Sequence, residues 1–405
     1  MTQSNTWNNR LKAVALGLGI ALSALTIRHW YGTFMVGHPP CHNCRADFPG
    51  FYAAAKLVWQ TPSRLYAYGD QLAIQKAIDN RIGDSILPFA YPPFTAIVLM
   101  PFGWLPFRGA FAAMTLANAM LLALLLKLLI QRLELGKDQT TWLWLSTFCN
   151  FGVHSVMLQG QTSLIVLSFL TAFMFSLRGG RQSWAGCWAG AIFFKPQLLA
   201  VPFITLFFQR LWRGLAIAVT VVTGLSVFSL ILVGAAGIGE YLHLLKFYGT
   251  TESGFGSYPR DMHNLRALVQ YLVPFEYALY LWLGLVIPVA IATMWMNAQT
   301  RAAETSRLHL WIGNFMAIML LTPHLYPHDL ALLIVPSALV LKLRGDSPST
   351  LIHFSLIVLG VLPLLPFLLG DRAPPLVPLI LLAVLFWCVR FVRQGKRLHE
   401  RIAMV

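Results

Sequence analysis

The residues of this chain that could carry chemistry are few, and they lie in short polar patches between long apolar runs. A carboxylate in such a patch could take a proton from a hydroxyl group, and lysine or histidine side chains could hold an anion such as phosphate. The six patches are RADFPGFY around Asp47 and residues 91–93, 159–161, 195–197, 261–264 and 323–329.

The composition places these patches in a membrane protein. Of the 405 residues, 57% are hydrophobic and 11% are charged, whereas soluble proteins carry about 25% charged residues. Many windows reach the roughly 20 apolar residues that a spanning helix needs. The first window, at residues 11–27, has no small-residue cleavage site after it and is interpreted as an uncleaved anchor. We therefore predict an all-α polytopic membrane protein, in which ionisable groups mark function by default.

The formal net charge of +15 could indicate nucleic-acid binding, but its distribution argues against that partner. Most Lys and Arg residues lie in short clusters between apolar runs, as the positive-inside rule expects of cytoplasmic loops. We predict membrane lipids as surroundings and no nucleic-acid partner.

Placing the basic clusters in the cytoplasm gives about twelve transmembrane or re-entrant segments with both termini inside. One domain, 1–405, would carry a large first extracytoplasmic loop at 28–108 and a second at 237–275, and all six patches would face the outer side. A re-entrant hairpin would turn at Lys195 and Pro196, since proline removes a backbone donor. The predicted helices are 11–30, 109–131, 141–158, 162–178, 184–194, 197–209, 212–236, 276–297, 308–322, 328–343, 350–369 and 374–393.

Two stretches of the first loop have distinct patterns. Residues 48–60 show apolar positions at helical spacing, which predicts an amphipathic helix. Residues 91–106 are apolar but contain four prolines, which predicts a broken segment at the membrane interface. The lone C-x-x-C of Cys41 and Cys44 could be a disulfide, two free thiols or half of a metal site.

Each polar patch has a structural interpretation beside a functional one. Asp47 could cap the helix that follows it, or act as a general base with a pKa raised by partial dehydration. Lys195 could reach to the interface or pair with an anion, such as a lipid phosphate. His263 and Asn264 could cap a helix or bind a ligand. Asp329 could cap the next helix. The two histidines beside it, His324 and His328, could donate hydrogen bonds or positive charge to a phosphate.

Motifs of nucleotide, dinucleotide and zinc-protease chemistry are missing from the sequence. It contains no H-E-x-x-H, P-loop, G-x-S-x-G or dinucleotide fingerprint. We therefore expect a substrate energised by a lipid carrier, because such a carrier shares the membrane with the protein.

The ordered set of motifs resembles glycosyltransferase family 87. The motifs are D-F-x-x-[FY]-Y-x-A-A, F-x-Y-P-P, G-Q-x-S, K-P-Q, H-N-L and P-H-x-Y-x-x-D-L, within about residues 20–340. The resemblance implies a GT-C-type fold. It also implies transfer of a hexose, with mannose as the family's sugar, from a polyprenyl-phosphate carrier to a lipid or glycan acceptor. The site would face the periplasm of a bacterial cytoplasmic membrane.

The resemblance also implies roles for residues. Asp47 aligns with the catalytic base, and transfer would invert the anomeric configuration. No Asp-Asp or Glu-x-Asp pair occurs in the first loop, so we expect no metal or other cofactor. The expected donor-phosphate ligands are Lys195, His263, His324, Arg260 and Arg266. The expected substrate-binding residues are Tyr52, Tyr91, Gln161, Gln197, Asn264, Tyr326, His328 and Asp329.

Two other function classes compete with an enzyme. A lipid-linked glycan transporter or flippase would place charges near the membrane midplane, whereas the predicted helix centres carry almost none. A non-catalytic scaffold would have no reason to bring Asp47, Lys195 and His324 together.

Overall fold

A computed structural model describes residues 2–31, 47–78, 86–250, 261–299, 304–344, 362–364 and 374–403. The described chain is mostly helical and contains no strand. Five of its helices are long and apolar enough to cross a membrane, at Asn8–Trp30, Phe107–Leu133, Trp212–Tyr248, Phe275–Ala298 and Val377–Gln394. The protein is an all-α polytopic membrane protein, as predicted.

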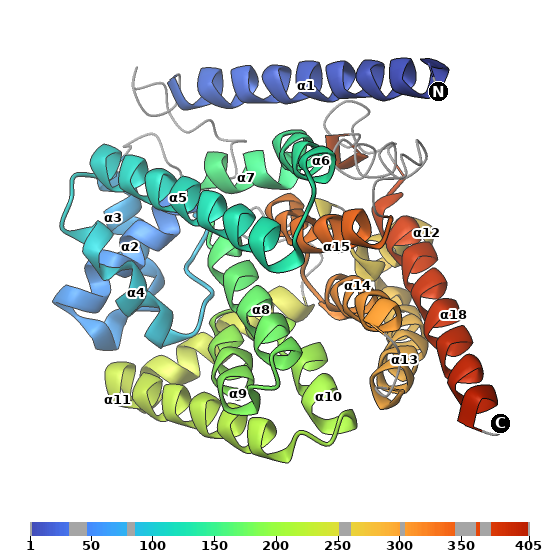
Figure 1. The fold of residues 1–405 in the computed structure, drawn as a ribbon. Coiled ribbons are helices and arrows are strands. Elements are labelled where there is room, and N and C mark those ends of the chain that lie inside the picture. Colours follow the sequence, from blue (N-terminus) through green and yellow to red (C-terminus); the bar gives the residue numbers. More distant parts are fainter. Residues whose placement is uncertain are drawn as a thin grey trace.

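The two ends of the chain lie on the same side of the molecule (Figure 1). Helix α1 (Thr2–Trp30) runs along one edge, and α18 (Val377–Ala403) ends on the side where α1 begins. The first-loop elements gather at the opposite side. They are α2 (Phe48–Gln60), the 3₁₀ turn η2 (Pro62–Arg64), α3 (Tyr68–Ile78) and α4 (Pro93–Gly103). Which of these sides faces the cytoplasm stays a prediction.

The first-loop helices form a compact layer over their own apolar core. Helix α2 has the predicted bounds and packs against α4 so closely that a Cβ on Gly103 would lie 2.8 Å from the Ala55 carbonyl oxygen. Phe48, Phe51 and Phe111 belong to this core, which joins the layer to α5 (Phe107–Leu133). The layer thereby holds the start of α2 at a fixed place.

The predicted break at residues 91–106 is present at both ends of the segment, but residues 93–103 between the breaks form one helix. Pro93 opens α4, Pro92 and Pro106 immediately precede α4 and α5, and Pro101 lies in the last turn of α4. A proline at a helix start loses no intrahelical hydrogen bond, so α4 forms as one helix.

The predicted helix at 141–158 is two helices. α6 (Lys137–Phe148) and α7 (Phe151–Gln159) are separated by Asn150, whose side chain accepts a hydrogen bond from the Gly152 backbone N–H and donates one to the Leu330 carbonyl. These bonds satisfy the backbone at the break and tie it to a distant segment. Helix α8 (Ser163–Arg178) follows and packs against α5 and against the next helix, α9 (Gln182–Ala191).

The chain bends at Lys195 as predicted. Helix α9 (Gln182–Ala191) and the turn η3 (Ile192–Phe194) lead into Lys195, which has non-helical φ −126° and ψ 86°. The turn η4 (Pro196–Leu198) and α10 (Ala200–Phe208) lead away. Helices of this length cannot span a membrane at 1.5 Å per residue.

The remaining elements complete the bundle. The segment α11 (Trp212–Thr250) consists of two helices joined at Gly234, where the backbone is non-helical with φ 72° and ψ 174°. The first of the two ends close to the predicted end at 236. α12 (Leu265–Leu272), α13 (Phe275–Ala298) and α14 (Glu304–Leu321) follow. The predicted helix 328–343 begins instead as the 3₁₀ segment η6 (Pro327–Leu333) before α15 (Ile334–Arg344). The predicted helix 350–369 lies outside the described residues except for η7 (Leu362–Leu364).

Candidate active site

Asp47 stands at the start of α2 but does not use its side chain as a helix cap. Its backbone carbonyl accepts hydrogen bonds from Gly50 (3.0 Å) and Phe51 (3.2 Å), while its carboxylate makes no capping bond. Instead, the side-chain amide of Gln161 donates to Asp47 Oδ2. The Asp47 side chain is 15% exposed. The capping interpretation is therefore wrong for the side chain, and the carboxylate points to residues far along the chain.

Gly160 brings Gln161 into reach of Asp47. It ends α7 with a left-handed φ of 61°, and a Cβ there would lie 2.8 Å from the Phe48 ring. Glycine adopts this conformation without steric cost and allows the close approach. The turn between α7 and α8 therefore rests directly on the first residue of α2, beside Asp47.

Lys195 is paired with a carboxylate inside the protein. Its Nζ lies 2.5 Å from Asp329 Oδ1 and 3.1 Å from Ser163 Oγ, and the Ser163 hydroxyl donates to the same Asp329 oxygen at 2.8 Å. The two charged side chains are 3% and 5% exposed. Lys195 thus does not reach to the surface, and Asp329 does not cap the following helix.

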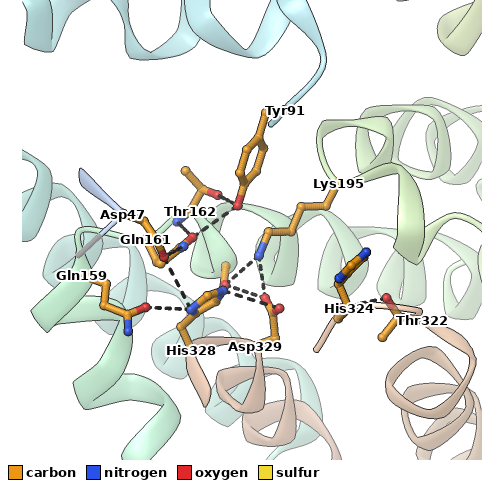
Figure 2. Close-up of polar contacts among 11 residues, drawn as sticks. Asp47, Tyr91, Gln159, Gln161, Thr162, Lys195, Thr322, His324, His328 and Asp329 are labelled. Carbon is orange, nitrogen blue, oxygen red and sulfur yellow. Dashed lines mark hydrogen bonds and ion pairs between the residues drawn. The ribbon is translucent and has the colours of Figure 1, made fainter. Parts of the chain in front are cut away.

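His328 lies between the two carboxylates, as Figure 2 shows. Its Nδ1 is 2.8 Å from Gln159 Oε1 and 3.9 Å from Asp47 Oδ2, and its Nε2 is 3.6 Å from Asp329 Oδ2. Residues from α2, the α7–α8 turn, the Lys195 bend and η6 therefore meet in one cluster. This chain of contacts brings Asp47 and Lys195 together, whereas a cavity lined by both of them with His263 and His324 stays a prediction.

The two carboxylates have opposite electrostatic settings. Burial raises the pKa of Asp47 to about 7, although the hydrogen bond from Gln161 and the charge of Lys195 oppose it. Burial also acts on Asp329, but Lys195 and the hydrogen bonds outweigh it and hold the pKa of Asp329 below its usual value. A group that titrates near neutral pH is suited to exchange protons, so of the two carboxylates Asp47 is the better suited to accept a proton, while Asp329 is the partner of Lys195.

A second group of cations and histidines borders the cluster. Burial lowers the pKa of His263 and of His324 to about 4. The charge of Arg266 acts on His324, and the Tyr326 ring stacks on His328 with centroids 6.0 Å apart. His263 Nε2 is buried without a hydrogen-bond partner. A buried polar atom left unpaired is costly, which marks this place as one where a ligand could bind.

Some predicted site residues serve the fold instead. The Tyr52 hydroxyl donates to the Leu105 carbonyl at 2.9 Å, and its ring packs on Phe107, so Tyr52 belongs to the first-loop core and not to the cluster. Asn264 caps α12 by accepting from the Ala267 N–H, and its amide donates to the Thr322 carbonyl. The helix-cap interpretation of Asn264 is confirmed.

Other predicted residues lie near the cluster or beyond the described chain. Gln197 lies half-buried in η4, two residues after Lys195. The Tyr91 ring lies under the Lys195 ammonium, 5.8 Å from it. Arg260, Cys41 and Cys44 lie outside the described residues.

Sequence reasoning missed Ser163, Thr162 and Gln159 as members of the cluster. Ser163 bonds both members of the ion pair, Thr162 bonds Tyr91, and Gln159 bonds His328. Their signal was present, since Gln159 belongs to a polar patch and Ser163 closes the G-Q-x-S motif. The sequence alone could not show that Ser163, a small residue at the start of an apolar helix, contacts Lys195 and Asp329.

The profile of glycosyltransferase family 87 matches residues 89–323. The chain belongs to glycosyltransferase family 87. No curated protein and no solved structure matches the chain significantly. Family membership, together with the apolar helices, makes the protein a membrane glycosyltransferase and decides against the transporter and the scaffold.

The matched range contains only part of the cluster. Gln161, Lys195 and His263 lie within residues 89–323, whereas Asp47 and Asp329 lie outside them. The fold joins the two sets, because Gln161 bonds Asp47 and Lys195 bonds Asp329. The cluster thus combines residues from inside and outside the matched range.

Proposed function

We propose that this glycosyltransferase moves a hexose, with mannose as the favoured sugar, from a polyprenyl-phosphate carrier to a hydroxyl group of a lipid or glycan acceptor. The observation that carries the proposal is the setting of Asp47. Its carboxylate leaves its own helix uncapped, stays partly exposed and lies within 3.9 Å of the histidine that borders the Lys195–Asp329 pair.

In the proposed reaction, Asp47 takes the proton of the acceptor hydroxyl as the oxygen attacks the anomeric carbon. The bond between that carbon and the carrier phosphate oxygen breaks, and the electron pair leaves with the phosphate. Attack from the face opposite the phosphate inverts the configuration, by analogy with inverting glycosidases. Because burial raises the pKa of Asp47 to about 7, turnover should fall as the pH drops below 7 and the carboxylate is protonated.

The leaving phosphate needs positive charge or hydrogen-bond donors nearby. Lys195 supplies a charge already balanced by Asp329, so a net attraction for the donor calls for further groups. His263, His324 and Arg266 border the cluster. Burial holds both histidines neutral, and a neutral imidazole still donates one hydrogen bond. We assign the phosphate to this side of the cluster and expect no metal to be required.

The proposed orientation puts the cluster on the outer face of a bacterial cytoplasmic membrane. Support comes from the side of the molecule on which α2–α4 lie, opposite both termini (Figure 1). A donor that lives in the membrane can enter from the lipid, so no nucleotide sugar is required.

The test is transfer from radiolabelled polyprenyl-phosphate-mannose in membranes that contain the protein. Membranes with Asp47→Asn serve as the matched control, since this variant keeps the shape of the side chain. We expect label in a new glycolipid or glycan only with the unchanged protein. Equal labelling in both membranes would refute the base assignment, and label from a nucleotide sugar alone would refute the donor.

A further inference from the structure

Asp47 is held by a side chain whose own orientation is fixed. Gln161 Oε1 accepts hydrogen bonds from the Thr162 backbone N–H and from the Tyr91 hydroxyl, each at 3.2 Å. A backbone N–H can only donate, so the oxygen end of the amide must face Thr162. The NH₂ end then has to face Asp47, and it donates to Oδ2.

The amide belongs to a longer chain of hydrogen bonds. The Thr162 hydroxyl donates to the Tyr91 hydroxyl at 3.2 Å, and the Gln161 backbone carbonyl accepts from the Asn118 side chain at 3.0 Å. Gln161 and Thr162 are 3% and 0% exposed. Figure 2 shows the order Thr162, Tyr91, Gln161, Asp47. Such a buried and satisfied network holds each member in one rotamer.

The second carboxylate oxygen of Asp47, Oδ1, differs in its contacts from Oδ2. Oδ1 accepts no hydrogen bond from any residue that the structure describes, and the side chain is 15% exposed. An amide donor on one oxygen stabilises the charged carboxylate and keeps the second oxygen pointed in one direction.

We propose that Gln161 is a positioning residue for the base: its amide fixes the rotamer of Asp47 and favours the carboxylate form over the acid. This inference rests on the proposed function, because it assumes that Asp47 is the base. In this proposal Gln161 contacts the base and not the substrate, which replaces the substrate-binding role expected from the sequence. Tyr91 likewise holds the Gln161 amide in place through its hydroxyl group.

The test is the pH dependence of transfer by Gln161→Met, which keeps the length of the side chain and removes its donor. Losing a hydrogen bond to a charged group should move the midpoint of the acid limb upward by roughly one to two pH units. The KM for polyprenyl-phosphate-mannose should stay near the wild-type value while kcat falls. A merely structural role would lower activity without moving the midpoint.

Two further variants keep the test decisive. Tyr91→Phe removes one of the two bonds that hold the amide, and we expect a smaller shift in the same direction. Gln209→Met serves as the control, because it removes a glutamine amide elsewhere in the protein. The Gln209 Nε2 donates to Asn297 Oδ1 at 3.1 Å, and we expect this variant to leave the midpoint unchanged.

The outcomes separate this inference from the proposed function. If Asp47→Asn is inactive but Gln161→Met keeps the wild-type midpoint and raises KM, Gln161 contacts substrate and the inference is wrong. A midpoint equal to wild type in both Gln161→Met and Tyr91→Phe overturns it as well. If Asp47→Asn keeps near-normal transfer, the proposed base is wrong and the inference goes with it.

Discussion

Two buried carboxylates, Asp47 and Asp329, lie on either side of His328, and their surroundings shift their pKa values in opposite directions. Asp329 is locked to Lys195 at 2.5 Å and to Ser163 at 2.8 Å. Asp47 receives one amide donor and lies 3.9 Å from the nearest His328 nitrogen. Both residues are aspartates, so the difference between the counter-ion Asp329 and the proposed base Asp47 comes from their neighbours: Asp329 contacts a charged lysine, whereas Asp47 contacts a neutral amide.

The comparison also separates two ways of anchoring a side chain. Asp47 is set by a layer of helices that packs on its own aromatic core, through Phe48. Lys195 and Asp329 sit on short 3₁₀ segments inside the main core. The proposed base thus follows from the packing of the first-loop layer, and the ion pair lies on elements that exclude water.

The largest effect is expected from breaking the ion pair. Asp329→Asn leaves the Lys195 charge buried without its counter-ion, which typically costs about 3–5 kcal/mol of stability. Thermal unfolding in detergent measures this cost. The double variant Lys195→Met with Asp329→Leu should regain much of the stability but no transfer. If Asp329→Asn unfolds like the wild-type protein, the pair is not the structural anchor described here.

Replacing Lys195 should weaken binding of the donor substrate and also slow its turnover. Lys195→Ala leaves the Asp329 carboxylate without its counter-ion, which adds an unbalanced negative charge beside the proposed phosphate in both ground and transition states, so KM should rise while kcat falls. We expect a loss of roughly 10²–10³-fold in kcat/KM. Steady-state kinetics with varied donor tests this, and an unchanged KM would contradict a phosphate position beside the Lys195–Asp329 pair.

A smaller effect is expected at Gly160. The substitution Gly160→Ala places a Cβ 2.8 Å from the Phe48 ring and at a left-handed φ, which costs about 1–2 kcal/mol for the backbone alone. The turn should shift and take Gln161 with it, lowering kcat with little change in KM. Gly180→Ala is the matched control, because that glycine also has a positive φ but no atom within 4 Å of a Cβ. Equal loss of kcat in both variants would show that contact with Phe48 is irrelevant.

The smallest effect is expected at Tyr52, which belongs to the first-loop core. Tyr52→Phe removes one hydrogen bond to the Leu105 carbonyl, worth about 1 kcal/mol, and should leave turnover and its pH dependence unchanged. A large fall in turnover at unchanged stability would return Tyr52 to the site.

Sequence patterns predicted the elements better than the contacts between them. The bounds of α2 and the bend at Lys195 follow from local spacing and from proline, and both are present. Local patterns could not show that Asn150 divides a helix by bonding to Leu330, 180 residues away. They also could not place Asp329 beside Lys195, since these residues are separated by 134 positions.

The interpretation of Asp47 and Asn264 as helix caps also shows that local sequence patterns do not reveal long-range partners. Asp before a helix start is a common cap, and Asp47 has that position without that bond. Asn264 has both the position and the bond. Sequence distinguishes these cases poorly because a cap competes with partners brought in by the fold, here the Gln161 amide.

The most direct test of the account is single-turnover transfer by Asp47→Asn, measured together with its affinity for polyprenyl-phosphate-mannose. Asn keeps the size of Asp but cannot accept the proton, and loss of a general base costs about 10²–10⁴-fold in rate. We predict a fall of that size with donor affinity close to that of the wild-type protein. Near-normal transfer by Asp47→Asn would contradict the account, and the base would then have to be sought at Asp261 and next at Asp329.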